Sequence, residues 1–188
     1  TGLGGITYNI GSTLHYTGST LSRDINAGTV DLPISGVAAN VIFNNTSSIG
    51  VRLFNFAGLP ITGAVTVSSG TLQLENNSTI ICNGTFAFQG NGTCAFGAGT
   101  PGITLNSNTD FTNGVFSATG GTGSITIAGA GGSIVGPLRV NSGASAGTAL
   151  SSLTISRAGS LSIGSTFSVR DVILGAAAPT LTIPVGQT

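Results

Sequence analysis

Apolar and polar residues alternate with a period of two along most of this chain. Short couplets of the form apolar-x-apolar recur, as in Val65-x-Val67, Leu72-x-Leu74 and Phe86-x-Phe88. Each couplet is closed by Gly, Asn or Ser, which tolerate turn and left-handed conformations. The chain shows no convincing apolar stripe with the 3.6-residue period of a helix. The pattern therefore predicts an all-β chain of short strands.

A second, longer period relates the couplets to one another. Matching positions lie about 22 residues apart, and the pairs that show this lag are Val65 and Phe86, Leu72 and Cys94, Ile80 and Ile103, Leu138 and Leu161, and Leu161 and Ile183. Self-similarity at this spacing is typical of a solenoid. We predict a β-solenoid (parallel β-helix) with rungs of about 22 residues, each made of three short strands, and about eight or nine rungs in all. The alternative, a β-sandwich or jelly roll, explains the alternation but not the lag.

The repeat is less regular near the start of the chain. We expect less regular solenoid rungs over residues 1–60 and regular rungs over 61–188, within one continuous domain that is a segment of a longer chain. The stretch Asp31 to Pro33 is predicted to be a longer loop or part of an irregular rung, and Ala144 to Ala149 an excursion at a rung corner.

Charged side chains are rare, and their scarcity argues against several classes of function. The 188 residues include ten charged side chains, no lysine and 31 glycines, and the net charge is zero; an average chain is about one quarter charged. We therefore expect a structural protein, not an enzyme, with no cofactor, no basic stripe for nucleic acid and no membrane span. So neutral a surface also predicts association with copies of the same chain.

The titratable residues do not form a convincing catalytic or metal-binding pattern. His15 is the only histidine, so no cluster of four zinc ligands is expected. A polysaccharide-cleaving site or a calcium site needs carboxylates on one face, but the five carboxylates are scattered: Asp24, Asp31, Glu75, Asp110 and Asp171.

The two cysteines leave two interpretations open. Cys82 and Cys94 are twelve residues apart, and both fall in phase with inward apolar neighbours. In an extracellular setting they could form a disulfide between adjacent strands across the Asn91-Gly92 corner. Alternatively, both thiols are small buried apolar fillers.

Six asparagines head Asn-x-Ser/Thr triplets, the acceptor pattern for N-linked glycans. Such triplets also arise by chance in a chain rich in Ser and Thr, and Asn is a common turn residue. We favour turn chemistry over glycosylation for these six: Asn44, Asn45, Asn76, Asn77, Asn83 and Asn91.

Several stretches of the chain share one repeating pattern of apolar positions and glycines. They are Val41-x-Phe43-x-Asn45, Gly50-Val51-x-Leu53, Thr62-Gly63-x-Val65-x-Val67-x-x-Gly70-x-Leu72-x-Leu74, Ile81-x-Asn83-Gly84-x-Phe86 and Leu153-x-Ile155-x-x-x-Gly159-x-Leu161-x-Ile163-Gly164-x-x-Phe167-x-Val169, with an echo from Thr7 to Ser19. These stretches resemble a β-solenoid repeat of giant surface proteins that gliding bacteria export by type IX secretion. Members of that family include gliding adhesins and grappling-hook-like fibres. No catalytic residue carries over from the repeat.

The resemblance implies an extracellular, cell-surface fibre that serves adhesion, prey capture or gliding. Its partners would be copies of itself in a homo-oligomeric bundle, with a cell-surface or glycan target. Two alternatives remain. A carbohydrate-binding adhesin would expose aromatic side chains on one face, and a phage tailspike-like β-helix would bring two or three carboxylates together in a groove.

Overall fold

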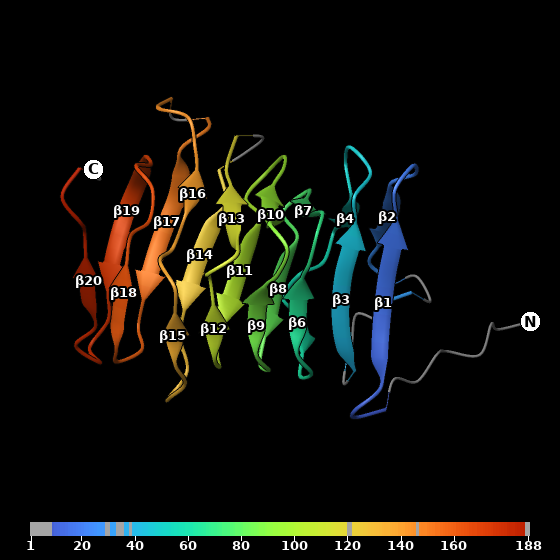
Figure 1. Ribbon diagram of the computed structural model, residues 1–188, viewed down its shortest axis with the longest axis horizontal. Helices are drawn as coiled ribbons and strands as arrows, with labels where there is room; N and C mark the ends of the chain where they lie inside the picture. Colours follow the sequence, from blue (N-terminus) through green and yellow to red (C-terminus); the bar gives the residue numbers. More distant parts are fainter. Residues whose placement is uncertain are drawn as a thin grey trace, which may run out of the picture.

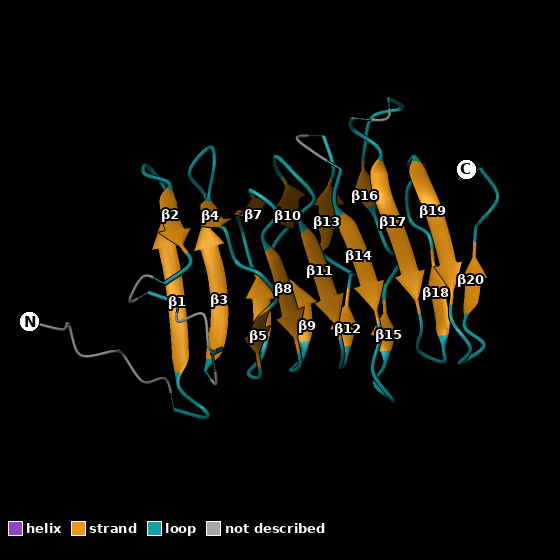
Figure 2. Ribbon diagram, turned by 180° about the vertical axis from the view of Figure 1, so that it is seen from behind, coloured by secondary structure: helices purple, strands orange, loops and turns teal. Residues whose placement is uncertain are grey.

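The computed structural model describes residues 9–28, 31–32, 36–37, 39–119, 122–145 and 147–186. Over these residues the chain is all-β, without a helix, and coils into an elongated stack of short strands (Figures 1 and 2). The part described therefore holds no helix that is long and apolar enough to cross a membrane. Three stretches that the sequence analysis singled out extend beyond the described residues: Thr7 to Ser19, Asp31 to Pro33 and Ala144 to Ala149.

The strands of the described residues form three parallel six-stranded sheets and one two-stranded sheet. In spatial order, the first sheet holds β1 (Thr13–Gly18), β3 (Asn40–Asn45), β6 (Val65–Val67), β9 (Phe86–Phe88), β12 (Thr109–Asp110) and β15 (Ile134–Val135). The second sheet holds β2 (Arg23–Asn26), β4 (Val51–Phe54), β7 (Thr71–Glu75), β10 (Gly92–Phe96), β13 (Gly114–Ser117) and β16 (Val140–Asn141). The third holds β5 (Leu59–Ile61), β8 (Thr79–Cys82), β11 (Gly102–Leu105), β14 (Ser124–Ile127), β17 (Leu150–Ile155) and β19 (Val169–Leu174). The last pair is β18 (Ser160–Ser162) and β20 (Thr180–Thr182).

This order confirms the parallel β-solenoid. Consecutive strands fall in different sheets, and each strand pairs in parallel with a strand one turn earlier or later. In the middle of the molecule Val65 pairs with Phe86 and Leu72 with Cys94, as the sequence lag predicts. The sandwich alternative is wrong, because it requires two sheets packed face to face rather than three sheets wound by one coiling chain.

Two of the predicted lags are wrong near the C-terminus. Leu138 pairs with Ile163 rather than with Leu161, and Leu161 pairs with Leu181 rather than with Ile183. Both errors are shifts of two residues. Because side chains on a strand alternate with a period of two, such a shift leaves the apolar pattern unchanged, and the pattern cannot detect it.

The solenoid has about six turns, fewer than the eight or nine expected. The main sheets hold six strands each, because several turns are longer than the expected repeat. Asp24 on β2 pairs in register with Arg52 on β4, 28 residues later in the chain. Ile125 pairs with Leu153, which is an equal separation. In this second case the extra residues lie in the loop between β16 and β17, where the sequence predicts a corner excursion.

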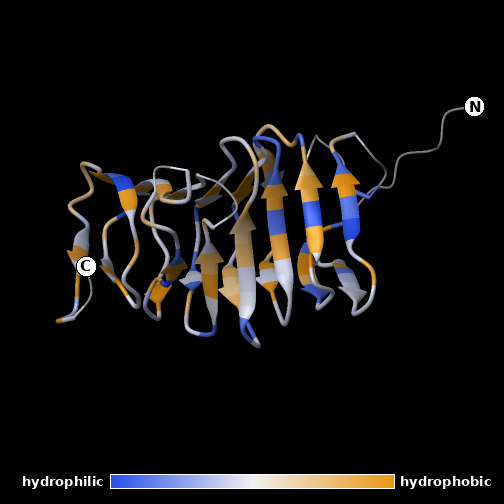
Figure 3. Ribbon diagram, turned by 90° about the horizontal axis from the view of Figure 1, so that it is seen from above, coloured by the Kyte–Doolittle hydropathy of each residue, from blue (hydrophilic) through white to orange (hydrophobic). Residues whose placement is uncertain are grey.

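The apolar residues of each couplet point into one continuous core. In β7 the burial alternates along the strand, with Leu72 and Leu74 fully buried and their neighbours half-buried. Figure 3 shows this alternation as hydrophobic and hydrophilic bands along single strands. Burial of apolar surface is the main driving force for folding, so one packed interior holds the turns together.

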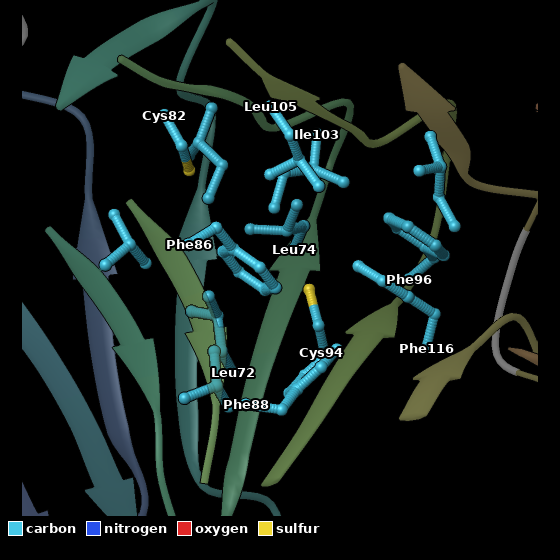
Figure 4. Close-up of a cluster of buried hydrophobic side chains, with 14 of the residues drawn as sticks. Leu72, Leu74, Cys82, Phe86, Phe88, Cys94, Phe96, Ile103, Leu105 and Phe116 are labelled. Carbon is cyan, nitrogen blue, oxygen red and sulfur yellow. The ribbon is translucent and has the colours of Figure 1, made fainter. Parts of the chain in front are cut away.

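Phenylalanine rings fill the middle of this core (Figure 4). The ring of Phe116 contacts four others, with centroid distances of 5.1 Å to Phe88, 5.9 Å to Phe111, 6.0 Å to Phe86 and 6.1 Å to Phe96. Edge-to-face and offset contacts at these distances stabilise a core beyond simple area burial. The rings come from two adjacent turns and join them through the interior.

Two glycines make room for these rings. A Cβ atom added at Gly123 would overlap the ring of Phe96, and one added at Gly114 would overlap the ring of Phe88. Neither glycine has a positive φ. Their role is therefore close packing against an aromatic ring and not the turn conformation that the sequence suggests for glycine.

Candidate functional surfaces

Polar side chains at the corners link each turn to the next. Asn106 donates from its side-chain amide to the amide oxygen of Asn83, 23 residues earlier, at 2.9 Å. The amide oxygen of Asn77 accepts from the backbone N–H of Thr100 at 2.7 Å and from its hydroxyl at 3.1 Å. These bonds have the same sequence lag as the strands, so they tie neighbouring rungs together.

Three of the six Asn-x-Ser/Thr asparagines occupy positions that suit turn chemistry, whereas Asn44 and Asn45 lie on β3. Asn76, Asn77 and Asn91 have φ values of 49°, 64° and 67°, which Asn tolerates better than most residues. Asn45 is 2% exposed, and its amide donates to the carbonyl of Leu21 at 3.0 Å. The remaining two, Asn44 and Asn83, are half-buried and exposed respectively. Glycosylation of these residues stays a prediction.

Both cysteines are free thiols that point into the core. Cys82 lies on β8 and Cys94 on β10, and both are 0% exposed (Figure 4). The two strands are not neighbours, because β8 pairs with β5 and β11 while β10 pairs with β7 and β13. The expectation that the two cysteines lie on adjacent strands is therefore wrong, and the structure contains no disulfide between them.

Burial keeps these thiols protonated. It raises the pKa of the Cys94 thiol to about 12. It raises the pKa of the Cys82 thiol well above its usual value, with a smaller contribution from the nearby Cys94. A thiol must lose its proton to act as a nucleophile or a metal ligand. Neither cysteine is therefore suited to either role in the folded protein.

Arg157 is a buried polar side chain that the sequence analysis missed. It is 1% exposed, and its guanidinium donates to the carbonyls of Ser107 and Gly131 and to the hydroxyl of Thr109. Its Nε atom has no hydrogen-bond partner, and burial lowers the pKa of the guanidinium. The sequence gives only a weak signal for this burial. Arg157 lies two residues after the inward-facing Ile155, so its phase predicts an inward side chain, whereas its charge predicts an exposed one.

Four of the five carboxylates are held by neighbouring groups. Asp24 accepts two hydrogen bonds from Arg52, at 2.6 and 2.7 Å, from the in-register position on the adjacent strand, and Asp31 pairs with Arg23 at 2.6 Å. The backbone N–H of Ala98 donates to Glu75, and that of Thr112 donates to Asp110. Asp171 is exposed on β19. Among the described residues no three His, Cys, Asp or Glu side chains converge as metal ligands would.

Two shallow polar grooves mark the solenoid surface. One, of about 330 Å³, lies between turns and is lined by Asn91, Thr112, Asn113, Gly114, Val115 and Arg139. The other, of about 390 Å³, is lined by His15, Tyr16, Thr17, Leu21, Ser22, Arg23 and Asn45. The described residues that line these grooves include no carboxylate. His15 faces solvent, as the alternation of Leu14 and Tyr16 predicts.

Aromatic side chains are covered throughout the described part of the chain. Seven of the nine phenylalanines are fully buried, while Phe54, Phe167 and Tyr16 are half-buried. Arg52 covers the ring of Phe54, 5.2 Å from its centroid. Sugar rings bind well on exposed aromatic faces, and the described residues include no fully exposed aromatic side chain, although the half-buried Tyr16 lines the groove beside His15.

Comparison with known proteins finds no match: no family model, no curated protein and no solved structure is similar to this chain. The assignment as a β-solenoid therefore rests on the geometry of the chain itself.

Proposed function

We propose that this chain is a structural segment of an extracellular, homo-oligomeric surface fibre that serves adhesion, prey capture or gliding. The proposal includes a relationship to the type IX-secreted surface adhesins of gliding bacteria, which rests on the sequence resemblance. The observation that carries it is the stack of turns that share one core, because such a stack transmits load along its axis through ladders of backbone hydrogen bonds.

The polar chemistry of the chain supports a role without catalysis. Both ion pairs among the described residues and the corner amides bind other parts of the same chain, although Arg23 also lines the groove beside His15. The tailspike-like alternative needs two carboxylates within about 10 Å in a groove. The described lining of the two polar grooves supplies none.

The adhesin alternative receives less support than the fibre. The groove beside Arg139 offers Asn91 and Asn113 as hydrogen-bonding groups, but its described lining has no aromatic side chain for a sugar ring to stack on. We therefore keep adhesion as a property of the fibre rather than of a glycan pocket in this segment.

Electron microscopy of the purified chain over a range of concentrations tests the proposal. Uniform filaments that lengthen with concentration are the expected result. A monodisperse monomer at millimolar concentration would contradict the proposed fibre. A glycan array on the same material provides the second arm, because tight binding of one glycan by the monomer would favour the adhesin alternative.

A further inference from the structure

One strand edge, away from both ends of the stack, is only partly paired. β13 pairs with β10 through all four of its residues, Gly114 to Ser117, but with β16 only through Phe116 and Ser117. The three strands lie side by side in the second sheet (Figure 1). A further turn follows them, since Leu138 pairs with Ile163. The gap beside the first half of β13 is therefore a feature of the stack and not of its end.

This gap leaves the backbone N–H of Gly114 without a partner on the next turn. Backbone N–H groups along a strand point alternately to its two neighbours. Phe116 donates to the carbonyl of Arg139 at 3.0 Å, which is toward the next turn, and Ala118 donates in the same direction. Gly114 lies two residues before Phe116 and points the same way, but no described residue of the next turn accepts from it. Gly114 lines the groove at this place, so its N–H is open to an acceptor there.

Arg139 lies over the same gap with a guanidinium that makes no ion pair among the described residues. Its Nη1 donates to the carbonyls of Phe111 at 3.5 Å and Thr112 at 2.9 Å. Its Nε and Nη2 donate to no described residue. These two groups form one edge of a planar fork, which matches two oxygens of a carboxylate, sulfate or phosphate.

The position of this guanidinium is fixed by the surrounding chain. A Cβ atom added at Gly164 would lie 3.0 Å from the Cγ of Arg139, so the next turn packs on the stem of this side chain. The hydrogen bond to the carbonyl of Thr112 holds the other end. A cation that is held in place before a ligand arrives loses less entropy on binding.

The remaining side chains of the groove add hydrogen-bonding groups and no negative charge. Asn91, Thr112 and Asn113 are exposed, and their side chains make no hydrogen bond within the described chain. Asp110 accepts from the backbone N–H of Thr112 at 2.9 Å and is not part of the lining. The groove, of about 330 Å³, has room for a small anionic group and carries a positive charge from Arg139.

We propose that this groove binds an oxyanion, a carboxylate, sulfate or phosphate group, between the guanidinium of Arg139 and the backbone N–H of Gly114. The guanidinium supplies the charge and two parallel donors, and Gly114 supplies a third donor. For a single small anion at so open a site we expect a dissociation constant on the order of 1 mM.

This inference goes beyond the proposed fibre, because one chain holds the whole site and no self-association is needed. It also differs from a glycan pocket built around an aromatic platform, since a charged group is recognised by charge and hydrogen bonds. A chain that stays monomeric would contradict the fibre and leave the anion site to be judged on its own test.

Backbone amide NMR of the isotope-labelled chain tests the site directly. Phosphate, sulfate and glucuronate are titrated separately in about 0.15 M sodium chloride, where charges more than about 8 Å apart are largely screened. The expected result is a saturable shift of the Gly114 amide signal. Stronger binding of phosphate or sulfate supports a site for tetrahedral anions, and stronger binding of glucuronate supports a site for carboxylates. No saturable shift of Gly114 with any of the three anions would overturn the proposal.

Two arginine variants provide a matched comparison. Arg139→Gln removes the guanidinium from the groove, whereas Arg170→Gln removes the same charge from an exposed position on β19 that does not line it. We expect Arg139→Gln to weaken anion binding by about tenfold or more, and Arg170→Gln to change it by less than about twofold. Equal weakening in the two variants would show a general attraction to the charge of the chain and would overturn the site.

A third variant keeps the test independent of the contacts that Arg139 makes with the fold. Asn113→Asp places a negative charge in the groove at an exposed position. It should also weaken anion binding, and unchanged binding would contradict the proposal. Urea unfolding of each variant confirms that it is folded.

A polymer of galacturonate distinguishes the source of the anion. Binding of the polymer that is lost in Arg139→Gln supports an acidic polysaccharide as the ligand. A Gly114 shift with the small anions and none with the polymer supports a site for free anions.

Discussion

The guanidinium of Arg157 donates a hydrogen bond to the backbone carbonyl of Ser107, fifty residues earlier in the chain. The same nitrogen donates to the carbonyl of Gly131, 26 residues earlier, at 3.2 Å. One buried side chain thus joins segments of three successive turns. Backbone ladders connect only neighbouring turns, so this contact adds a link of longer reach.

Replacement of Arg157 should therefore destabilise the solenoid. Arg157→Ala removes these donors and leaves a cavity where a 1% exposed side chain stood, and we expect the free energy of unfolding to fall by about 2–4 kcal/mol. Arg157→Lys should recover part of this loss, because one ammonium cannot reproduce the planar fork of the guanidinium. Urea unfolding followed by circular dichroism measures both.

The matched control is Arg170→Ala, which removes an exposed arginine on β19. Its effect on stability should stay within about 0.5 kcal/mol. If Arg157→Ala were equally mild, the buried guanidinium would not link the turns as the geometry indicates.

Gly123 should tolerate no side chain. A methyl group there would overlap the Phe96 ring, and this ring is stacked against Phe116. We expect Gly123→Ala to lower the melting temperature, with a loss of about 2 kcal/mol or more from overpacking. Calorimetry on the purified variant provides the measurement.

Gly147→Ala is the control, since a Cβ atom at Gly147 meets no atom within 4 Å. It should leave stability unchanged or raise it by a few tenths of a kcal/mol, because alanine restricts the unfolded chain. Equal losses in the two variants would mean that backbone conformation, and not contact with Phe96, explains the need for glycine at Gly123.

The buried thiols should make stability depend on alkaline pH. Their pKa values are raised in the folded state, so the full stability is present below the ordinary thiol pKa near 8.5. Above that pH only the unfolded chain loses thiol protons, and the free energy of unfolding should fall by about 1.4 kcal/mol per pH unit for each thiol. The effect should persist toward pH 12, the folded-state pKa of Cys94.

Urea unfolding at a series of pH values from 7.5 to about 10.5 tests this slope. The double variant Cys82→Ala/Cys94→Ala is the reference, because it retains every other titrating group. Its stability should decline less steeply above pH 9 than that of wild type. Parallel curves for the two proteins would show that the thiols ionise in the folded state.

The repeat length was visible in the sequence where the turns are close to the expected length of about 22 residues. Val65, Leu72 and Ile80 each pair with the residue that the expected lag identifies. Where the separation departs from this length the lag failed, as at Leu138, whose partner is Ile163, and at Leu161, whose partner is Leu181. An apolar period of two cannot distinguish registers that differ by two residues.

Chemistry at the corners and in the core was only partly predictable. Turn-forming asparagines such as Asn77 and Asn91 follow from residue type, since Asn tolerates positive φ. The burial of Arg157 does not, because its partners are backbone carbonyls up to fifty residues away. A sequence pattern identifies side chains, and it does not locate the carbonyls that approach them.

The amino-acid sequence alone determined that this protein is a β-solenoid, because an alternation of two within a repeat of about 22 residues requires short strands that coil and stack. Only the tertiary structure decided which residues meet across turns: the glycines that admit Phe rings, the arginine that joins three turns, and the two thiols that lie on different sheets. Those contacts depend on how many residues each turn contains. Loops of variable length set this number, and the local apolar pattern does not encode it.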